Sequence, residues 1–387
     1  MVRSLCMRMF FPVVIVALAL LGALFFSRDI ITPFFFKPTA TNIENNGASE
    51  EASAIHGPSS APEIVASNLR VPWDVVFLPN NGLLISERTG SLIYINRNGA
   101  QKRIPIPEAS SIGEGGLLGL ALHPQFSSNR FLYLYMTSNV PDGLTNRVVR
   151  YTFENTVLQN PVIIIADIPG ARHHDGGRIA FGPDEFLYIT TGDAGVGAHA
   201  QDIHSLAGKI LRLNDDGTIP SDNPFQNEVY SYGHRNPQGL AWDDAGELWS
   251  TEHGRSGVQS GFDELNRIER GGNYGWPKSE GGTVEEGTIP PIIHSGSDST
   301  WAPASLSYHS GYFFWGGLRG EGIYIAQKTA DGATLLSPRF FREYGRIRTI
   351  TIGHDGYLYF TTSNTDGRGR PQNADDKLYR IRPDALF

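Results

Sequence analysis

Two adjacent histidines stand among glycines and charged residues in residues 172–178, RHHDGGR. An imidazole titrates near neutral pH, so one of the two rings is a candidate general base. On an extended segment, neighbouring side chains point to opposite sides, so His173 and His174 are not expected to ligate one metal together. A structural histidine with satisfied hydrogen bonds is the alternative, and these residues taken alone favour it.

Residues 233–239, GHRNPQG, offer a planar cation and an amide in a rigid loop. Arg235 and Asn236 precede a proline, and glycines stand at both ends of the run. This combination suits a flat anionic or quinonoid ligand, because a guanidinium donates several hydrogen bonds in one plane. A loop that bonds only to itself is the alternative.

Oxygen ligands for a hard cation are offered by residues 252–255, EHGR. A bend with exposed carbonyl groups in this run, near the carboxylates of Asp263 and Glu264, would suit Ca²⁺. Backbone ligands leave little trace in a sequence, so this signal is weak by itself.

Arg346 and Arg348 are separated by one residue in a strand-like segment. Alternation along a strand places both guanidinium groups on one face. Together with Arg319 elsewhere in the chain, they suggest a ligand with several carboxylates. The alternative is a solvated basic face.

The composition limits the classes of protein to be considered. The 387 residues include 44 Gly, 24 Pro and 11% aromatic residues, which favours many short strands joined by turns. The single cysteine, Cys6, excludes a disulfide scaffold and a cysteine-built metal centre. The net charge of −8 argues against a nucleic-acid partner. The motifs G-x-S-x-G, H-E-x-x-H and Walker A are absent from the sequence.

Six segments share one irregular pattern, in which a short apolar strand, a turn and a second apolar strand follow one another. These segments are residues 73–90, 118–138, 178–195, 239–254, 348–367 and, more weakly, 304–327. We therefore predict an all-β fold, a six-bladed β-propeller of four-stranded antiparallel blades, with the polar clusters gathered at one end of its channel. A double-sheet sandwich and a parallel β-helix are less favoured alternatives.

The N-terminal residues are predicted to be a targeting segment. Residues 9–26 carry no charge and follow two arginines, and such a helix comes close to spanning a bilayer core of roughly 30 Å. Residues 1–36 are therefore predicted to be a signal-anchor, with a cleaved signal peptide as the alternative. Residues 37–62 are predicted to be a flexible linker, and residues 63–387 the propeller. The basic flank places the propeller outside the cytoplasm, periplasmic or at the cell surface and tethered to the membrane.

Several longer strings make a family resemblance visible. They include VPWDVVFLP, GGLLGLALHP, HHDGGRIAF, SYGHRNPQGLAW, GGNYGWP and GRIRTITIGHDGYLY, spread from about residue 69 to residue 383. With these strings the chain resembles the soluble sugar dehydrogenases that use pyrroloquinoline quinone (PQQ), the glucose/sorbosone dehydrogenase family, and looks most like its aldose sugar dehydrogenase branch. The resemblance implies a six-bladed propeller. It also implies oxidation of the C1 hydroxyl of aldose sugars to lactones, by general-base-assisted hydride transfer to PQQ, with Ca²⁺ in the site. An external quinone, cytochrome or dye would accept the electrons.

The resemblance also assigns roles to residues of this chain. It implies that His174 is the base, that Asp193 supports it, and that Arg235 acts on the quinone. The residues that it assigns to the cofactor are Arg235, Asn236, Arg319, Arg346, Arg348 and Glu114. It assigns Ca²⁺ to the backbone carbonyls of Gly254 and Arg255.

Three positions depart from the family pattern. Arg255 stands where a proline is usual, Arg319 where a lysine contacts the quinone, and Glu114 where a glutamine reaches substrate and cofactor. Glu114 is expected to add a negative charge to the pocket. The resemblance therefore leaves the cofactor affinity and the choice of sugar open.

Two other functions are compatible with a propeller. A non-catalytic binding module would keep the scaffold, but it has no need of the full set of His174, Arg235, Asn236, Arg346 and Arg348. A Ca²⁺-dependent lactonase needs carboxylate and amide side chains that converge on the metal, and the sequence offers no obvious set of them.

Overall fold

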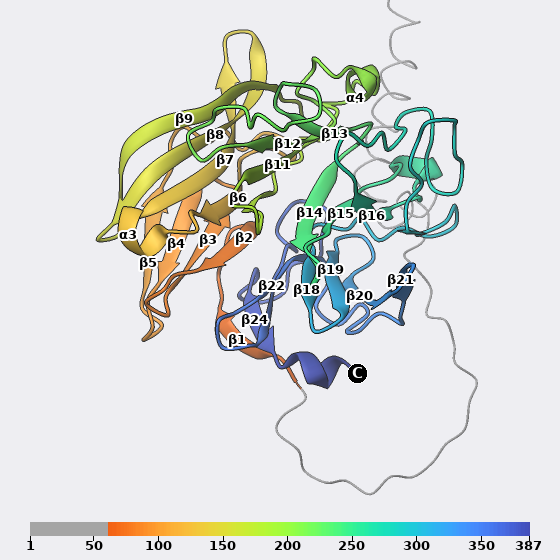
Figure 1. The fold of residues 1–387 in the computed structure, drawn as a ribbon. Helices are drawn as coiled ribbons and strands as arrows, with labels where there is room; N and C mark the ends of the chain where they lie inside the picture. Colours follow the sequence, from red (N-terminus) through yellow and green to blue (C-terminus); the bar gives the residue numbers. More distant parts are fainter. Residues whose placement is uncertain (1–60) are drawn as a thin grey trace, which may run out of the picture.

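The computed structural model describes residues 61–387 (Figure 1). The predicted targeting segment, residues 1–36, and nearly all of the predicted linker lie outside the described residues. Within residues 61–387, the structure contains no helix with the length and apolar character needed to cross a membrane.

In the described part of the chain, twenty-four strands form six antiparallel sheets of four strands each. The first sheet consists of β2 (Pro72–Phe77), β3 (Leu83–Glu87), β4 (Ser91–Ile95) and β5 (Gln101–Pro105). The second consists of β6 (Leu117–Leu122), β7 (Phe131–Val140), β8 (Gly143–Glu154) and β9 (Val157–Pro169). The third consists of β10 (Ile179–Phe181), β11 (Leu187–Thr191), β12 (Lys209–Leu213) and β13 (Val229–Tyr232).

The remaining sheets continue around the molecule in sequence order. The fourth consists of β14 (Pro237–Trp242), β15 (Leu248–Glu252), β16 (Glu264–Ile268) and β17 (Ile293–His294). The fifth consists of β18 (Ser307–His309), β19 (Tyr312–Gly317), β20 (Gly322–Thr329) and β21 (Gly332–Leu335). The sixth consists of β22 (Ile347–Ile352), β23 (Leu358–Thr362), β24 (Leu378–Ile381) and β1 (Glu63–Ala66). The helical elements of residues 61–387 are short: α3 (Phe126–Asn129), α4 (Ala198–Gln201), η1 (Gly257–Gln259) and η2 (Pro383–Leu386).

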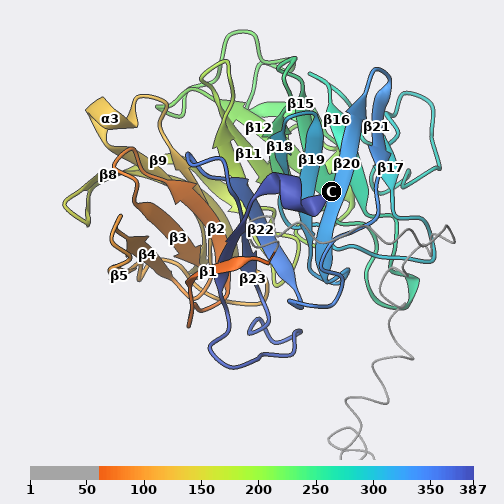
Figure 2. The same ribbon diagram turned by 90° about the horizontal axis from the view of Figure 1, so that it is seen from below.

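The six sheets close into a ring. Contacts between neighbouring sheets join β2 to β6, β6 to β10, β11 to β14, β14 to β18, β18 to β22 and β22 back to β2. Strand β1 completes the last sheet by pairing antiparallel with β24, so the orange first strands and the blue last strands lie side by side in Figures 1 and 2. The predicted six-bladed propeller is confirmed, and the sandwich and β-helix alternatives are wrong.

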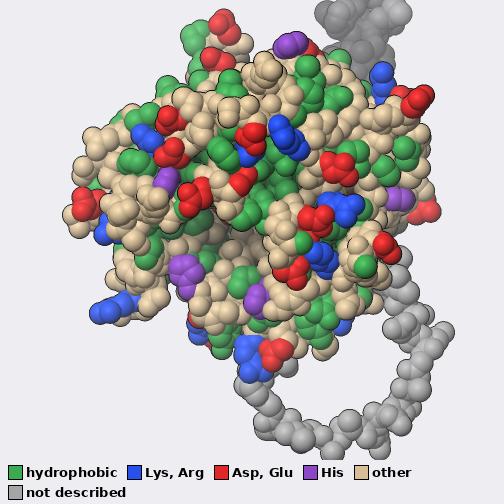
Figure 3. Space-filling model, in the orientation of Figure 1, with side chains coloured by type: hydrophobic (Ala, Val, Ile, Leu, Met, Phe, Trp, Pro, Cys, Tyr) green, Lys and Arg blue, Asp and Glu red, His purple; other side chains and the backbone are tan. Residues whose placement is uncertain are grey.

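The second strands of four sheets show why these residues form blades. Their sequences, LLISE, LYITT, LWSTE and LYFTT, begin apolar and end with hydroxyl or carboxyl side chains, and all four strands are buried along their whole length. Burial on both faces requires a blade on either side, and the apolar clusters accordingly combine residues of adjacent sheets, such as Trp73, Tyr133 and Ile189. Figure 3 shows acidic and basic side chains interspersed over one face of the outer surface.

A buried lysine fixes the loop that follows β11. Lys209, in β12, is fully buried, and its ammonium donates hydrogen bonds to the carbonyls of His199 (2.7 Å), Ala200 (3.1 Å) and Ala207 (2.6 Å). Burial lowers the pKa of Lys209 to about 7. The lysine thereby ties α4 and residue 207 to the sheet that carries them.

Stability should depend on pH through Lys209. An unfolded lysine titrates near its ordinary pKa of 10.5, so between about pH 7 and pH 10 the unfolded chain binds more protons and the free energy of unfolding rises with pH. Lys209→Met should abolish this contribution. The difference in free energy of unfolding between wild type and Lys209→Met should therefore change with pH, by at most roughly 1.4 kcal/mol per pH unit. Urea unfolding at pH 7, 8 and 9 measures it, with Lys102→Met on the exposed β5 as the control for loss of one surface charge. A pH-independent difference would contradict the assignment.

Candidate active site

The topology gathers the candidate residues at one end of the ring. In an antiparallel four-stranded sheet, the loop before the first strand and the loop after the second lie at the same end. Glu114, His174, Arg235, Asn236 and Arg346 precede the first strand of their sheets. Asp193, Gly254, Arg255 and Arg319 follow the second strand of theirs. Loops distant in sequence therefore meet at this end.

His174 and Asp193 form a close pair. Nδ1 of His174 lies 2.7 Å from Oδ1 of Asp193, which also accepts the N–H of Gly195 (2.8 Å), while Oδ2 accepts Nε1–H of Trp276 (2.8 Å). Burial acts to raise the pKa of Asp193, but the hydrogen bonds from His174, Gly195 and Trp276 outweigh it and lower the pKa. Burial also lowers the pKa of His174, against the opposing effect of Asp193. An ionised Asp193 requires the proton of neutral His174 on Nδ1, which leaves a lone pair on Nε2.

The backbone around the two histidines differs from the extended segment expected. His174 has a φ of 63°, in the left-handed region, and the rings of His173 and His174 meet edge to face with centroids 4.7 Å apart. The prediction that they point to opposite sides is therefore wrong, because the left-handed backbone turns both rings toward one cavity. A side chain at position 192 would meet the carbonyl oxygen of His174 at 1.9 Å, so this close approach requires Gly192.

A cavity of about 490 Å³ opens beside this pair. Its lining residues are His173, His174, Asp193, Gly195, Gly197, Arg235, Arg255, Ser256, Gln259, Trp276, Pro277 and Glu280. Four of the predicted residues, His174, Asp193, Arg235 and Arg255, therefore line one space. Trp276 and Glu280, which no prediction singled out, reach the cavity from the long loop between β16 and β17.

Arg235 and Asn236 are held by groups outside their own loop. The backbone N–H of Arg235 donates to Glu252, and Oδ1 of Asn236 accepts the N–H of Gly176 (3.0 Å). The Arg235 guanidinium donates to Oγ of Ser256 (3.2 Å) and lies over the Trp276 ring, 5.3 Å from its centroid. The alternative of a loop bonded only to itself is therefore wrong.

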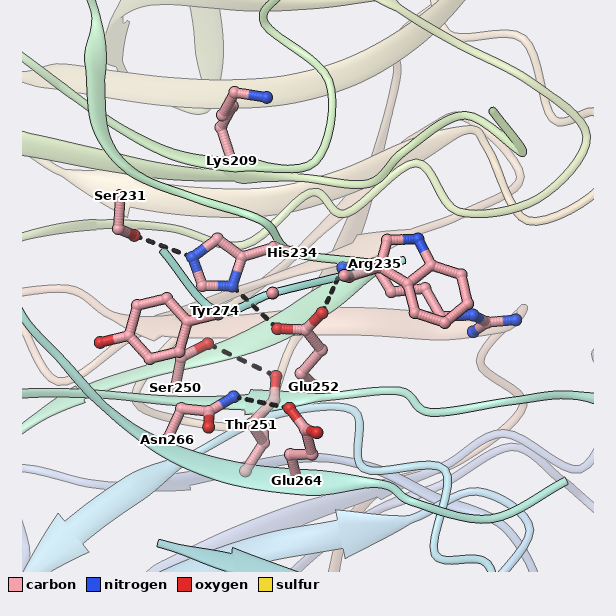
Figure 4. A network of polar contacts seen from close by, with 12 residues as sticks. Lys209, Ser231, His234, Arg235, Ser250, Thr251, Glu252, Glu264, Asn266 and Tyr274 are labelled. Carbon is pink, nitrogen blue, oxygen red and sulfur yellow. Dashed lines mark hydrogen bonds and ion pairs between the residues drawn. The ribbon is translucent and has the colours of Figure 1, made fainter. Parts of the chain in front are cut away.

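A buried network beneath Arg235 fixes its backbone (Figure 4). Nδ1 of His234 lies 2.9 Å from Oε2 of Glu252, and Nε2 lies 2.8 Å from Oγ of Ser231. The ring of His234 stacks on Tyr274, with centroids 4.7 Å apart. One carboxylate, that of Glu252, thus binds both the His234 ring and the backbone N–H of Arg235. These two contacts prevent this part of the loop from moving freely.

The arginines near the axis form a buried basic cluster. Arg346 and Arg348 are only 7% and 5% exposed, so the alternative of a solvated basic face is wrong. Arg346 pairs with Asp366 (2.8 Å), whereas Arg348 donates only to neutral groups, Ser363 and Gln238. Burial, followed by the charge of Arg88, lowers the pKa of Arg348 to about 9.

Arg88 was missed by the sequence interpretation. It follows the second strand of the first sheet, the position that Asp193 and Gly254 occupy in theirs, and this shared position is the signal that would have found it. Among the described residues, the buried Nε atoms of Arg88 and Arg235 and Nε2 of His253 have no hydrogen-bond partner. Uncommitted buried donors and an excess of positive charge fit an anionic ligand with several acceptors.

The negative charge that Glu114 was expected to add is balanced by a cation. Its Oε1 lies 2.8 Å from the Arg368 guanidinium, and its Oε2 accepts the N–H of His174 (3.1 Å). Burial acts to raise the pKa of Glu114, but Arg368 and the His174 N–H outweigh it and lower the pKa to about 2. Arg368 was also missed, because its partner lies 254 residues earlier in the chain.

The candidate cation ligands lie in a bend braced by hydrogen bonds. The N–H of Gly254 donates to Asp263 (2.9 Å), whose other oxygen accepts the N–H of Trp301 (2.6 Å). The backbones of Arg255 and Gly261 bond to each other, and the Arg255 guanidinium pairs with Glu280. No three or more His, Cys, Asp or Glu side chains of residues 61–387 converge as a metal site, so a bound Ca²⁺ would depend on backbone carbonyls.

Comparison with known proteins gives concordant matches. The sequence model of the family described as Glucose / Sorbosone dehydrogenase matches residues 69–380. The PQQ-bound aldose sugar dehydrogenase of Streptomyces coelicolor has a similar structure, with a TM-score of 0.78 and 37% identity over 84% of this chain and 99% of that one. An aldose sugar dehydrogenase of Escherichia coli is 32% identical over 79% of this chain and 90% of that protein. Quinoprotein glucose dehydrogenase B of Acinetobacter calcoaceticus is 36% identical over 57% of this chain and 52% of that protein.

Proposed function

Because this chain belongs to the glucose/sorbosone dehydrogenase family, we propose that it is a PQQ-dependent enzyme that oxidises the C1 hydroxyl of an aldose to the lactone. The observation that carries the proposal is the His174–Asp193 pair, with Nδ1 and Oδ1 2.7 Å apart, at a cavity shared with Arg235. This arrangement provides a neutral imidazole with one lone pair and a cation beside it. Both are needed to remove a hydroxyl proton while negative charge moves to an acceptor.

The protein's own part in the reaction is proton removal. Nε2 of His174 accepts the proton of the C1 hydroxyl as the C1 hydride leaves, and Asp193 stabilises the imidazolium that forms. A bound PQQ would supply the two-electron acceptor for that hydride. Arg235 lowers the energy of negative charge that develops beside it, because it is fixed before the reaction by Ser256, Glu252 and Trp276.

The residues present fit a flat polycarboxylate cofactor. Arg346 and Arg348 would bind its carboxylates, and Arg235, Asn236 and Arg319 its quinone oxygens. The unpartnered Nε of Arg88 adds a donor to the buried cluster. A Ca²⁺ ion on the carbonyls of Gly254 and Arg255 would act as a Lewis acid.

The proposal includes a place for the enzyme. The uncharged residues 9–26 after two arginines support an extracytoplasmic propeller, periplasmic or at the cell surface and held at the membrane, where an external quinone or cytochrome takes the electrons. Phase separation of the full chain with detergent, compared with a chain lacking residues 1–36, tests this attachment.

Reconstitution of the full chain tests the activity. Protein with PQQ and Ca²⁺ is expected to reduce a dye with at least one sugar of an aldose panel and to shift the quinone absorbance on addition of that sugar. Protein with Ca²⁺ alone is expected to be inactive on both aldoses and lactones. PQQ binding without turnover of any aldose would indicate a binding module, and lactone hydrolysis with metal alone would indicate a lactonase; either result would overturn the proposal.

A further inference from the structure

Glu114 connects the loop before β6 to the loop that carries His174. The backbone N–H of Glu114 donates to the carbonyl of Arg172 (3.0 Å), and its side-chain Oε2 accepts the backbone N–H of His174 (3.1 Å). A Cβ at position 113 would lie 2.1 Å from the same Arg172 carbonyl, so Gly113 permits the two loops to approach. The loop before β6 is therefore hydrogen-bonded to the loop that carries His174 on both sides of His173.

The backbone conformation of His174 requires such a restraint. A φ of 63° is unusual for a residue other than glycine, and it persists only where the surroundings determine it. The N–H of His174 is held by Glu114, and its carbonyl oxygen accepts the N–H of Ala194 (3.3 Å). The His174 backbone is therefore restrained by two hydrogen bonds. One is accepted by the side chain of Glu114, and the other is donated by the backbone beside Asp193.

Arg368 holds Glu114 from a third direction. It lies in the loop after β23, in the sixth sheet, and its guanidinium lies 2.8 Å from Oε1 of Glu114. The Arg368 side chain is 64% exposed and that of Glu114 is 22% exposed. Salt therefore weakens the ion pair on its exposed arginine side, while the hydrogen bond from the His174 N–H to Glu114 stays sheltered.

We propose that Glu114 and Arg368 are positioning residues for His174, with Glu114 fixing its left-handed backbone and Arg368 balancing the charge of Glu114. This inference rests on the proposed function, in which His174 is the base. It gives the departure from the family pattern at position 114 a specific consequence, since a carboxylate there requires a cation to balance it.

The charges that face His174 define the expected pH behaviour. They are Asp193, Arg235 and Glu114, and the ring of His173 lies against it. Glu114 favours the imidazolium, so its removal should lower the pKa of His174 and move the acid limb of the pH–rate profile to lower pH. Removal of Arg368 leaves Glu114 unbalanced, so the limb should move to higher pH.

Four variants of the full chain test the inference: Glu114→Ala, Glu114→Gln, Arg368→Gln and, as the matched control, Arg370→Gln two residues away on the exposed part of the same loop. Glu114→Ala should lower kcat about tenfold or more with a smaller change in KM, because a misplaced base loses its alignment. Glu114→Gln should recover most of that loss, since the amide oxygen still accepts the His174 N–H. Glu114→Gln and Arg368→Gln should shift the acid limb in opposite directions, the second shift shrinking in 0.5 M NaCl, whereas Arg370→Gln should shift nothing.

A second readout separates this inference from the proposed function. The pKa of the His174 imidazole, measured by NMR in protein without PQQ and assigned with His174→Gln, should move down in Glu114→Gln and up in Arg368→Gln. These shifts do not require turnover, so they remain measurable even if the wild type oxidises no aldose. Shifts of the same sign, or an unchanged kcat and an unchanged imidazole pKa in Glu114→Ala, would overturn the inference.

Discussion

His174→Gln is expected to abolish aldose oxidation while leaving PQQ binding largely intact. The glutamine amide can still donate to Asp193, whose carboxylate holds Nδ1 of His174 at 2.7 Å, but it cannot accept a proton at neutral pH. General-base catalysis typically contributes 10²–10⁴-fold, so kcat should fall by at least about 100-fold. Dye-reduction kinetics measure kcat, and an absorbance titration with PQQ measures the binding.

His173→Gln is the matched control for this prediction. His173 lines the same cavity and its ring contacts that of His174, but it has no carboxylate partner that corresponds to Asp193 among the described contacts. It is expected to lose far less activity. If His174→Gln keeps more than about a tenth of wild-type kcat, or if His173→Gln is the inactive variant, the assignment of the base is wrong.

Arg348→Ala is expected to weaken PQQ binding by about 30-fold or more while lowering kcat at saturating PQQ much less. Truncating one member of a buried, charged hydrogen-bond pair typically costs 2–5 kcal/mol, and every 1.4 kcal/mol is tenfold in Kd. Arg348 donates only to Ser363 and Gln238, so its charge is uncommitted until an anion arrives. PQQ titration gives the Kd, and dye reduction at saturating PQQ gives kcat.

The same arginine should be a liability to the protein without its cofactor. Burial and the charge of Arg88 lower the pKa of Arg348 to about 9, which means that the folded state disfavours this cation. Arg348→Met, which keeps most of the volume, is therefore expected to raise the unfolding midpoint of the PQQ-free protein. Arg382→Met, at an exposed arginine paired with Asp384, is the control.

A larger loss of kcat than of PQQ affinity in Arg348→Ala would assign this residue to the chemistry instead.

Much of the fold was predictable because each blade has a recognisable pattern within a short stretch of sequence. A strand such as LYITT, an adjacent turn and a second apolar strand are readable in a short window, and β11 and its neighbours form where expected. Once six blades are recognised, the end of the ring at which the site lies follows from the alternating direction of successive strands in each blade. The positions of His174 and Arg235 in loops at that end needed no further information.

What could not be predicted depends on partners distant in the chain or on backbone conformation. Arg368 has an unremarkable local sequence, and only the ring brings it within 2.8 Å of Glu114, 254 residues earlier. The left-handed φ of His174 leaves no signature of its own, which is why the two histidine rings were expected on opposite sides. Arg88 follows an ordinary strand, and its unpartnered Nε becomes visible only when its neighbours are in place.

The pairing of β1 with β24 also sets the order of events during synthesis. β1 is the first strand of the propeller and β24 is the last, and the two pair with each other, so the ribosome must finish β24 before the ring can close. Until then the nascent blades expose unpaired strand edges and apolar faces that are prone to join other chains. A ribosome stalled before residue 378 should therefore hold a chain that chaperones bind and proteases cut, whereas release of the last residues makes the whole ring resistant at once.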